Sequence, residues 1–448
     1  MKILFVSLGC DKNLVDSEHM SGLLSKAGYE FTDDETQADV IVINTCCFIH
    51  DAKEESINTI LEMAQYKEQN LKALVVAGCL AERYKDEILK EIPEIDAVLG
   101  TTSYDSIVEA VNTALEENTG EHFEHYESID YLPDNSEVER VVTTGNHMAY
   151  LKIAEGCDKR CSYCIIPKIR GRFRSVPMQE LLNEAKRLAS EGVKELVLVA
   201  QETTLYGKDL TGEKQLPLLL HELCKIEGIE WIRLLYCYPE EITDELIKVI
   251  KTEEKVCNYI DMPIQHSENR ILQRMGRRTS REDLVAVIKK LRKEIPDITI
   301  RTTLITGFPG ESQEDHEGLM NFVEECQFDR LGVFTYSPEE DTLAATFEDQ
   351  IDEEVKEERR DELMSLQQEI SYDKGTDRIG QELLVMIEGK VADENAYVGR
   401  TYRDAPNVDG LIFVNTDEEL MTVLKAGMNA PSGGNKQSPI FIAVQNKE

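Results

Sequence analysis

Three cysteines with C-x3-C-x2-C spacing carry the strongest chemical signal in the sequence. Cys157, Cys161 and Cys164 follow Gly156 and precede Pro167, and charged residues lie between the first two. Glycine, proline and charged residues favour a loop over a buried helix. Three thiolates supply one ligand fewer than a 4Fe–4S cluster needs, so one iron would stay open to another ligand. The spacing therefore predicts a cluster that takes part in chemistry.

Two other interpretations of this triplet are open from the residues alone. Cysteines at i, i+4 and i+7 also match a stripe of small apolar side chains on a buried helix. A zinc site is the second alternative, although zinc sites usually combine two cysteines with a distant second pair. No such pairing is obvious in this chain. Core cysteines rarely cluster in this way, so the iron-sulfur interpretation is preferred.

Three further cysteines, Cys10, Cys46 and Cys79, each follow a predicted strand in the first hundred residues. Alternating strands and helices are typical of a parallel α/β sheet, whose strands end at one edge, where ligands bind. Taken singly, each cysteine is better explained as an ordinary buried residue. Three in the same topological place predict a second cluster, and Cys47 is expected to point elsewhere. The predicted strands are 3–8, 40–44 and 73–77, with helices from near residues 13, 51 and 81.

A longer strand-helix alternation follows the first domain. Six strand-helix units predict an incomplete (β/α)6 version of the parallel TIM-like barrel, with the 157–164 triplet at the rim after the first strand. Strands are expected at 148–154, 195–200, 231–236, 259–262, 299–305 and 331–336, and helices at 178–190, 243–252, 281–294 and 313–325.

The domains predicted from these patterns follow one another along the chain. The acidic stretch 116–146 has turn residues and is interpreted as a linker, and the short strands after Gly380 indicate a small β-barrel of the oligonucleotide-binding kind. The predicted boundaries are an N-terminal cluster domain 1–115, the linker 116–146, the barrel 147–347, a connecting helix 348–379, the small barrel 380–420 and an atypical tail 421–448.

Composition restricts the classes of partner. The 448 residues carry a net charge of −37, which disfavours a large nucleic-acid footprint, so RNA binding is expected to be weak or absent. No apolar run approaches membrane-spanning length, and a cytoplasmic protein without a membrane partner is expected. Eleven cysteines are too few for a disulfide scaffold in so long a chain, which favours metal or cluster ligation.

Several segments resemble a known family. The stretch from Gly156 to Pro167 is similar to the radical S-adenosylmethionine signature, and the strand-end cysteines resemble those of its methylthiotransferase branch, which also shares the domain order and ends in a TRAM domain. Within that branch, the enzymes that modify an aspartate of small-subunit ribosomal protein S-twelve are the most similar. The segments that carry this resemblance are 7–18, 156–171, 234–239, 260–266 and 305–311.

The resemblance implies two 4Fe–4S clusters and S-adenosylmethionine as cofactors. It assigns Cys10, Cys46 and Cys79 to the first cluster and the 157–164 triplet to the second, whose open iron binds S-adenosylmethionine. A 5′-deoxyadenosyl radical then removes hydrogen from the β-carbon of the target aspartate, and the first cluster presents the methylated sulfur. An electron donor such as flavodoxin or ferredoxin is implied as a partner.

Beyond the six cysteines, other residues are candidates for the cofactor site, and no catalytic residue is assigned. By resemblance, Tyr163 contacts the adenine, although packing explains a tyrosine equally well. Gly307 and Gly310 allow close backbone approach to the cofactor, or are turn glycines. Further rim candidates are Gln201, Glu202, Asp261, Gln265 and His266, of which His266 is better explained as a hydrogen-bonded structural residue.

Two other functions stay open. A tRNA methylthiotransferase acting on a modified adenosine would use the same chemistry, but nine acidic against four basic residues over 380–425 disfavour it. A non-enzymatic iron-sulfur protein is the other alternative. After about Met421 the chain departs from the family and resembles part of a flavin-binding nitroreductase, for which no flavin activity is predicted. The small barrel is therefore expected to be incomplete.

Overall fold

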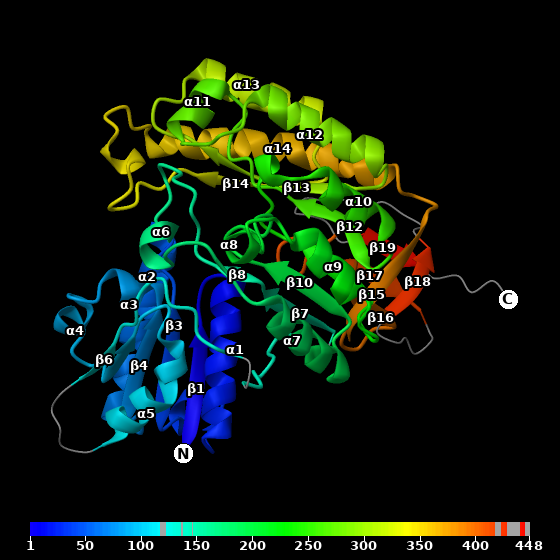
Figure 1. The fold of residues 1–448 in the computed structure, drawn as a ribbon. Helices are drawn as coiled ribbons and strands as arrows, with labels where there is room; N and C mark the ends of the chain where they lie inside the picture. The colour runs from blue at the N-terminus through cyan, green and yellow to red at the C-terminus, as the bar shows by residue number, and fades with distance from the viewer. Residues whose placement is uncertain (117–121, 136–137, 146, 417–422, 428–439, 444–448) are drawn as a thin grey trace.

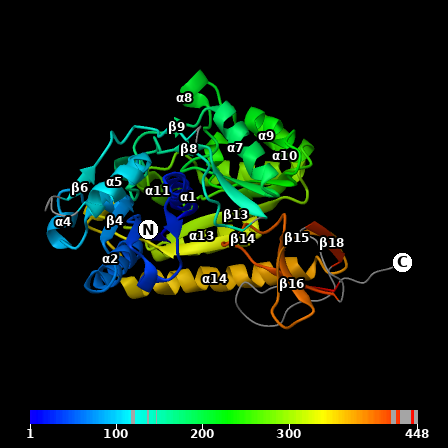
Figure 2. The same cartoon turned by 90° about the horizontal axis from the view of Figure 1, so that it is seen from below.

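The computed structural model describes residues 1–116, 122–135, 138–145, 147–416, 423–427 and 440–443 (Figure 1). These residues form two six-stranded parallel sheets, a smaller five-stranded sheet and a two-stranded ribbon. The two parallel sheets belong to separate α/β units, and the smaller sheet lies at the far end of the long helix α14 (Figure 2).

The N-terminal sheet has the strand order β2-β1-β3-β4-β5-β6 and is parallel throughout. Every residue of β3 and β4 is buried, because helices cover both faces. Ile60 and Leu80 belong to the core on one face, and Leu24 and Ile107 to the core on the other. The elements are β1 Lys2–Ser7, α1 Asp11–Lys26, β2 Glu30–Phe31, β3 Val40–Thr45, α2 His50–Ala64, β4 Ala73–Gly78, α3 Cys79–Arg83, α4 Ile88–Glu91, β5 Ala97–Leu99, α5 Ile107–Leu115 and β6 Phe123–His125.

Strand β6 lies in the segment predicted to be a linker. It pairs with β5 as the edge strand of the sheet, with Phe123 opposite Ala97. The sequence Phe-Glu-His has only three residues and no apolar run, so its periodicity does not distinguish a strand from a loop. The linker prediction is therefore wrong for these three residues.

The central sheet forms the partial barrel expected from the sequence, with strand order β14-β13-β12-β11-β10-β7. Helices α12 and α13 both begin with capping boxes, in which Ser280 with Asp283 and Ser312 with Asp315 exchange side-chain and backbone hydrogen bonds. The strands are β7 Met148–Lys152, β10 Glu195–Val199, β11 Trp231–Leu234, β12 Val256–Asp261, β13 Thr299–Thr306 and β14 Arg330–Thr335. The helices are α6 Ile166–Ile169, α7 Met178–Ser190, α8 Lys208–Thr211, α9 Leu216–Cys224, α10 Asp244–Thr252, α11 Asn269–Arg274, α12 Arg281–Glu294 and α13 Gln313–Cys326, and the ribbon is β8 Ala154–Glu155 with β9 Arg174–Ser175.

The C-terminal sheet follows α14 Glu353–Thr376 and packs against the barrel through buried charges. Glu195 at the start of β10 accepts from Arg233 at 2.6 Å and from Arg400 of the small sheet at 2.7 Å. All three side chains are fully buried, so each charge depends on its partners. The strands are β15 Glu382–Lys390, β16 Ala396–Thr401, β17 Ile412–Asn415, β18 Val423–Gly427 and β19 Ile440–Ala443.

Strands β18 and β19 come from the segment predicted to be an atypical tail. β18 pairs antiparallel with β15, and β19 pairs parallel with β17. The segment after Met421 therefore supplies two strands to the small sheet. Strand pairing uses backbone N–H and C=O groups, so a segment whose sequence differs from the family pattern can still pair with an exposed edge strand of the sheet.

Candidate functional site

Cys10, Cys46 and Cys79 lie at the carboxyl ends of β1, β3 and β4, which are neighbours in the sheet. The side chain of Asn13 connects all three strand ends. Its Nδ2 donates to the carbonyl of Leu8 at 2.9 Å and to that of Thr45 at 2.8 Å, and the Cys79 Sγ lies 3.9 Å from its Oδ1. The topology therefore brings these cysteines to one place, as the sequence predicted.

Gly9 lets Cys46 approach the turn that carries Cys10. The φ angle of Gly9 is +88°, and a Cβ at this position would lie 2.6 Å from the Cβ of Cys46 and 2.9 Å from its Sγ. No side chain fits in that space, so the close contact between these two strand ends requires glycine.

Burial disfavours ionisation of two of the N-terminal thiols, Cys46 and Cys79. It raises the pKa of Cys46 and, more strongly, that of Cys79, and neighbouring thiolates raise both pKa values further. The guanidinium of Arg170 opposes this rise at both cysteines. Thiols of this kind release their protons when they bind a metal centre, so binding to this set depends on pH.

The second triplet lies in a loop held by backbone contacts. Cys157 N–H donates to the carbonyl of Gly171 at 3.1 Å, and Cys164 N–H donates to the carbonyl of Cys161 at 3.1 Å. Gly156 has φ +75°, and a Cβ there would lie 2.1 Å from the Arg172 carbonyl oxygen. Burial raises the pKa of Cys157 to about 12 and also raises that of Cys164. The three cysteines therefore lie in a loop before α6, outside any helix, and the helical-stripe alternative is wrong.

The donor sets suit iron-sulfur clusters. Two groups of three cysteine thiols match sites in which three irons of a 4Fe–4S cluster are ligated and the fourth is open. Such clusters distribute their ligands over separate irons, so the thiols need not converge on one point. Within the described residues, no three Cys, His, Asp or Glu side chains are arranged to hold a single metal ion.

One buried polar network lies between the two cysteine sets. Arg170, close behind the triplet, contacts Asp16 at 2.8 Å and Glu155 at 3.2 Å, and also donates to the side chain of Asn13. Lys152 pairs with Asp16 and with Glu155, the latter at 2.8 Å. Asn13, which contacts the three N-terminal strand ends, is thus hydrogen-bonded to Arg170, the residue that follows α6 after the triplet.

Apolar packing brings the same two regions together. Ile165 and Ile169, on either side of the α6 turn that follows the triplet, are part of the hydrophobic core of the N-terminal unit. The hydroxyl of Thr101 donates to the Ile169 carbonyl at 2.8 Å. The sequence did not mark Arg170 and these isoleucines as functional positions, because Arg170 stands in a stretch that also contains Lys168 and Arg172.

Tyr163 lies beside the triplet, while the two candidate glycines contact other parts of the chain. The Tyr163 ring meets Phe308 edge-on at 6.5 Å, and burial raises its pKa well above the usual value. A Cβ at Gly307 would lie 2.1 Å from the Lys356 side chain, and one at Gly310 would lie 2.4 Å from Asp349. Both glycines have positive φ. Close packing against the chain therefore accounts for them, and the cofactor prediction for them stays untested.

Of the rim candidates, Gln201 and Glu202 contact residues beside the triplet, Glu155 and Lys159. Gln201 donates to Glu155 at 2.8 Å, in the network around Arg170. Glu202 is fully buried, and one carboxylate oxygen has no hydrogen-bond partner in the structure. Burial raises the pKa of Glu202 to about 7, while Lys159, 3.8 Å away, opposes the rise.

The other three rim candidates follow β12. Asp261 accepts from the backbone of Tyr236 at 2.9 Å and from Arg301 at 2.8 Å. Gln265 has φ +72°. His266 is fully buried and its Nδ1 accepts from the Glu268 N–H at 3.0 Å. Its Nε2 is buried without a hydrogen-bond partner in the described structure, so one of the two ring nitrogens is hydrogen-bonded and the structural role stays a prediction.

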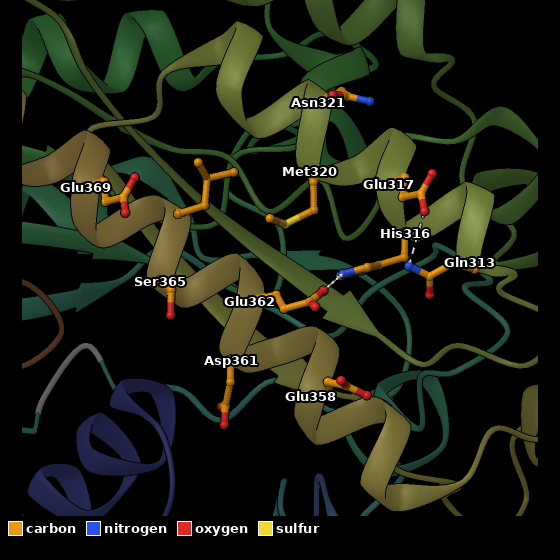
Figure 3. A pocket seen from close by; sticks show the side chains of 11 residues that line it. Gln313, His316, Glu317, Met320, Asn321, Glu358, Asp361, Glu362, Ser365 and Glu369 are labelled. Carbon is orange, nitrogen blue, oxygen red and sulfur yellow. Dashed lines mark hydrogen bonds and ion pairs between the residues drawn. The ribbon is translucent and has the colours of Figure 1, made fainter.

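A separate groove of about 960 Å³ lies between α13 and α14. Figure 3 shows the side chain of His316 pointing toward Glu362, and its Nε2 lies 2.7 Å from that carboxylate. None of the six candidate cluster cysteines lines this groove, so it is distinct from the cysteine site. Its lining residues are Gln313, His316, Glu317, Met320, Asn321, Glu358, Asp361, Glu362, Ser365, Leu366 and Glu369.

The fold and the two cysteine sets define a radical S-adenosylmethionine enzyme of the methylthiotransferase class. Three family models match the chain: uncharacterized protein family UPF0004 over residues 2–100, the radical SAM superfamily over 151–323 and the TRAM domain over 379–430. Iron-sulfur and S-adenosylmethionine chemistry belong to this class.

Curated relatives specify the family. The ribosomal protein uS12 methylthiotransferase RimO of Lachnoclostridium phytofermentans is 62% identical over 423 residues, which span 94% of this chain and 95% of that protein. RimO of Acetivibrio thermocellus is 51% identical, over 94% of this chain and 93% of that protein. The chain therefore belongs to the RimO family.

Solved structures show the same fold at low sequence identity. The radical S-adenosylmethionine methyltransferase TsrM of Kitasatospora setae superposes with a TM-score of 0.54 at 15% identity, over 74% of this chain and 72% of TsrM. In the part of the chain that the structure describes, no helix combines the length and apolar character needed to span a membrane.

Proposed function

We propose that this protein transfers a methylthio group to the β-carbon of an aspartate in small-subunit ribosomal protein uS12. The observation that supports this most directly is the bond network through Arg170, which connects Asn13, at the N-terminal cysteines, with Glu155, just before the barrel triplet. Methylthio transfer needs one site that generates a substrate radical and another that presents sulfur, so the two sites must be held together.

Six cysteines hold the clusters in this proposal. Cys10, Cys46 and Cys79 hold the sulfur-presenting cluster, and Cys157, Cys161 and Cys164 hold the cluster with the open iron. When bound, these groups supply the electron that cleaves S-adenosylmethionine and the sulfur that the aspartate β-carbon receives in place of hydrogen.

The surrounding chain positions reactants and limits access of water. Tyr163 is proposed to contact the adenine ring, since it is half-buried beside the triplet and next to Phe308. Glu202 has a buried carboxylate oxygen without a partner, which suits it to receive a hydrogen bond from a bound cofactor. Buried surroundings protect reactive intermediates from side reactions.

The proposed partners are protein uS12 and an electron donor such as flavodoxin or ferredoxin. A net charge of −37 suits contact with a basic ribosomal protein better than with RNA phosphates. We therefore propose weak or absent RNA binding and a cytoplasmic location, where the small subunit is present.

Intact-mass measurement of ribosomal protein and nucleoside analysis of tRNA in a deletion strain test this function. In the deletion strain, we expect the target aspartate of uS12 to carry hydrogen in place of a methylthio group, which lowers the mass of uS12 by that difference. The tRNA nucleosides should be unchanged. Re-expression of the wild-type chain restores the mass, whereas a Cys157→Ala, Cys161→Ala, Cys164→Ala chain does not. Loss of a tRNA methylthio group with unchanged uS12 would replace this proposal with the tRNA alternative.

A further inference from the structure

Residues 337–349, between β14 and α14, form a segment that we call the strap. It is drawn in yellow near α6 in Figure 1. The strap contacts the triplet loop directly and reaches the N-terminal cysteine set through Arg83, without using the Arg170 network. At the triplet, Ala344 N–H donates to the carbonyl of Ser162 at 2.8 Å. Ser162 lies between Cys161 and Cys164, so this contact is within the loop that carries the barrel thiols.

Arg83 forms the contact between the strap and the N-terminal set. Its Nη1 lies 3.1 Å from Glu339 Oε2, and its Nη2 donates to the Glu340 carbonyl at 2.9 Å. The same Nη1 donates to the Cys47 carbonyl at 3.0 Å, directly beside Cys46. Arg83 is also the last residue of α3, which begins at Cys79. One guanidinium therefore connects the strap with the backbone around two of the three N-terminal thiols.

Hydrogen bonds within the strap fix the position of Glu339. Its Oε1 accepts from the Ser337 hydroxyl at 2.8 Å, and its carbonyl accepts from the Thr342 hydroxyl at 2.7 Å. The Glu339 and Arg83 side chains are 4% and 5% exposed. A buried, prearranged ion pair has one preferred geometry, unlike an exposed pair that samples several.

The far end of the strap is fixed to the barrel. Asp349 Oδ1 accepts from Arg274 at 2.6 Å, and the Asp349 carbonyl accepts from the Gly310 N–H at 2.8 Å. The strap is thus attached to the barrel at the triplet loop and at Asp349. It is attached to the N-terminal unit through Arg83 and through Tyr84, whose hydroxyl donates to the Glu340 carboxylate at 2.8 Å. Movement of the N-terminal cysteines away from the triplet has to break the Arg83–Glu339 pair.

We propose that Arg83 and Glu339 are positioning residues that set the separation of the two cysteine sets during methylthio transfer. This inference rests on the proposed function. Cleavage of S-adenosylmethionine needs only the barrel triplet, whereas transfer to the substrate needs both sets at the correct distance. Misplacement by about 1 Å can slow such a step by about a hundredfold. Loss of the pair should therefore uncouple cleavage from transfer.

The test uses the full-length protein reconstituted with iron and sulfide, carrying Glu339→Gln or Arg83→Gln. A uS12 peptide that contains the target aspartate, S-adenosylmethionine and a chemical reductant are added without oxygen. We expect unchanged iron content, unchanged 5′-deoxyadenosine formation and a fall of about tenfold or more in methylthiolated peptide per 5′-deoxyadenosine. Glu339→Asp keeps the charge and should restore part of that ratio.

The matched control is Glu294→Gln, which removes an exposed ion pair with Lys251 at 3.1 Å between α10 and α12. It should leave the ratio at the wild-type value. The strap proposal is overturned if the Glu339→Gln and Arg83→Gln ratios equal that of the control, or if iron, 5′-deoxyadenosine and product all fall in parallel. A wild-type chain that cleaves S-adenosylmethionine but never modifies the peptide would instead contradict the proposed function itself.

Discussion

Arg170 and Asp16 are joined across the boundary between the two α/β units, with Nη1 of the arginine 2.8 Å from Oδ2 of the aspartate. Asp16 lies on α1, the helix that Cys10 caps, and Arg170 lies just after the triplet loop. Both side chains are almost fully buried. A helix that begins at one cysteine set is therefore attached to the loop that carries the other.

Loss of the Arg170 contact should destabilise the protein. Arg170→Met would leave Asp16 and Glu155 buried with Lys152 as their remaining cationic partner. Removal of one member of a buried ion network costs about 3–5 kcal/mol. We expect a fall of several degrees in the midpoint of thermal unfolding. Arg172→Met, at a position whose side chain is 84% exposed, is the control and should leave the midpoint nearly unchanged.

The N-terminal cysteines should account for half of the bound iron. Replacement of Cys10, Cys46 and Cys79 by alanine is expected to lower the iron content of the reconstituted protein from about eight to about four per chain. Cys47→Ala is the matched control, because this neighbouring thiol is buried but not assigned to a cluster. Chemical iron analysis measures the difference, and an unchanged content in the triple variant would falsify the two-cluster proposal.

Gly9 and Gly28 have nearly the same backbone angle but different surroundings. Their φ values are +88° and +91°, yet a Cβ at Gly28 meets nothing within 4 Å, whereas one at Gly9 meets Cys46. Gly28→Ala should cost only the conformational strain, roughly 1–2 kcal/mol. Gly9→Ala should also displace Cys46 and lower the iron content toward about four per chain. Equal iron contents in the two variants would show that the contact at Gly9 does not support the cluster.

His266 should make stability fall at acidic pH. Burial lowers its pKa to about 3, so between about 6.5 and 3 the unfolded chain binds a proton that the folded protein does not. Stability therefore decreases as the pH falls through this range, by up to about 1.4 kcal/mol per pH unit. The charged or titratable groups around His266 are Glu311, Asp315, His316, Arg270 and Arg359.

His266→Asn isolates this contribution, because the neighbouring groups stay in both proteins. We expect the variant to lose less stability than the wild type between pH 6.5 and 4.5, measured as thermal midpoints at each pH. His221→Asn is the control, since His221 is about half exposed and pairs with Glu253 at 2.7 Å. The assignment fails if His266→Asn follows the wild-type curve in parallel over this range.

Much of the fold followed from local pattern. Helices α7 and α12 begin and end at the predicted residues, because their apolar positions repeat at helical spacing. Strand β6 was missed because three residues with one aromatic side chain carry no measurable period. Strands β18 and β19 were missed because backbone pairing with β15 and β17 needs little from the side-chain sequence.

The number, type and spacing of the cysteines indicated iron-sulfur chemistry before the fold was known, because these features are written in the chain itself. The sequence also placed Cys10, Cys46 and Cys79 together, because parallel strands share one carboxyl edge. The way the two sets are joined became visible in the folded chain alone. Arg170 with Asp16 and Arg83 with Glu339 are pairs separated by 154 and 256 positions. No local periodicity reports such contacts, because they form only when the two units pack and exclude water.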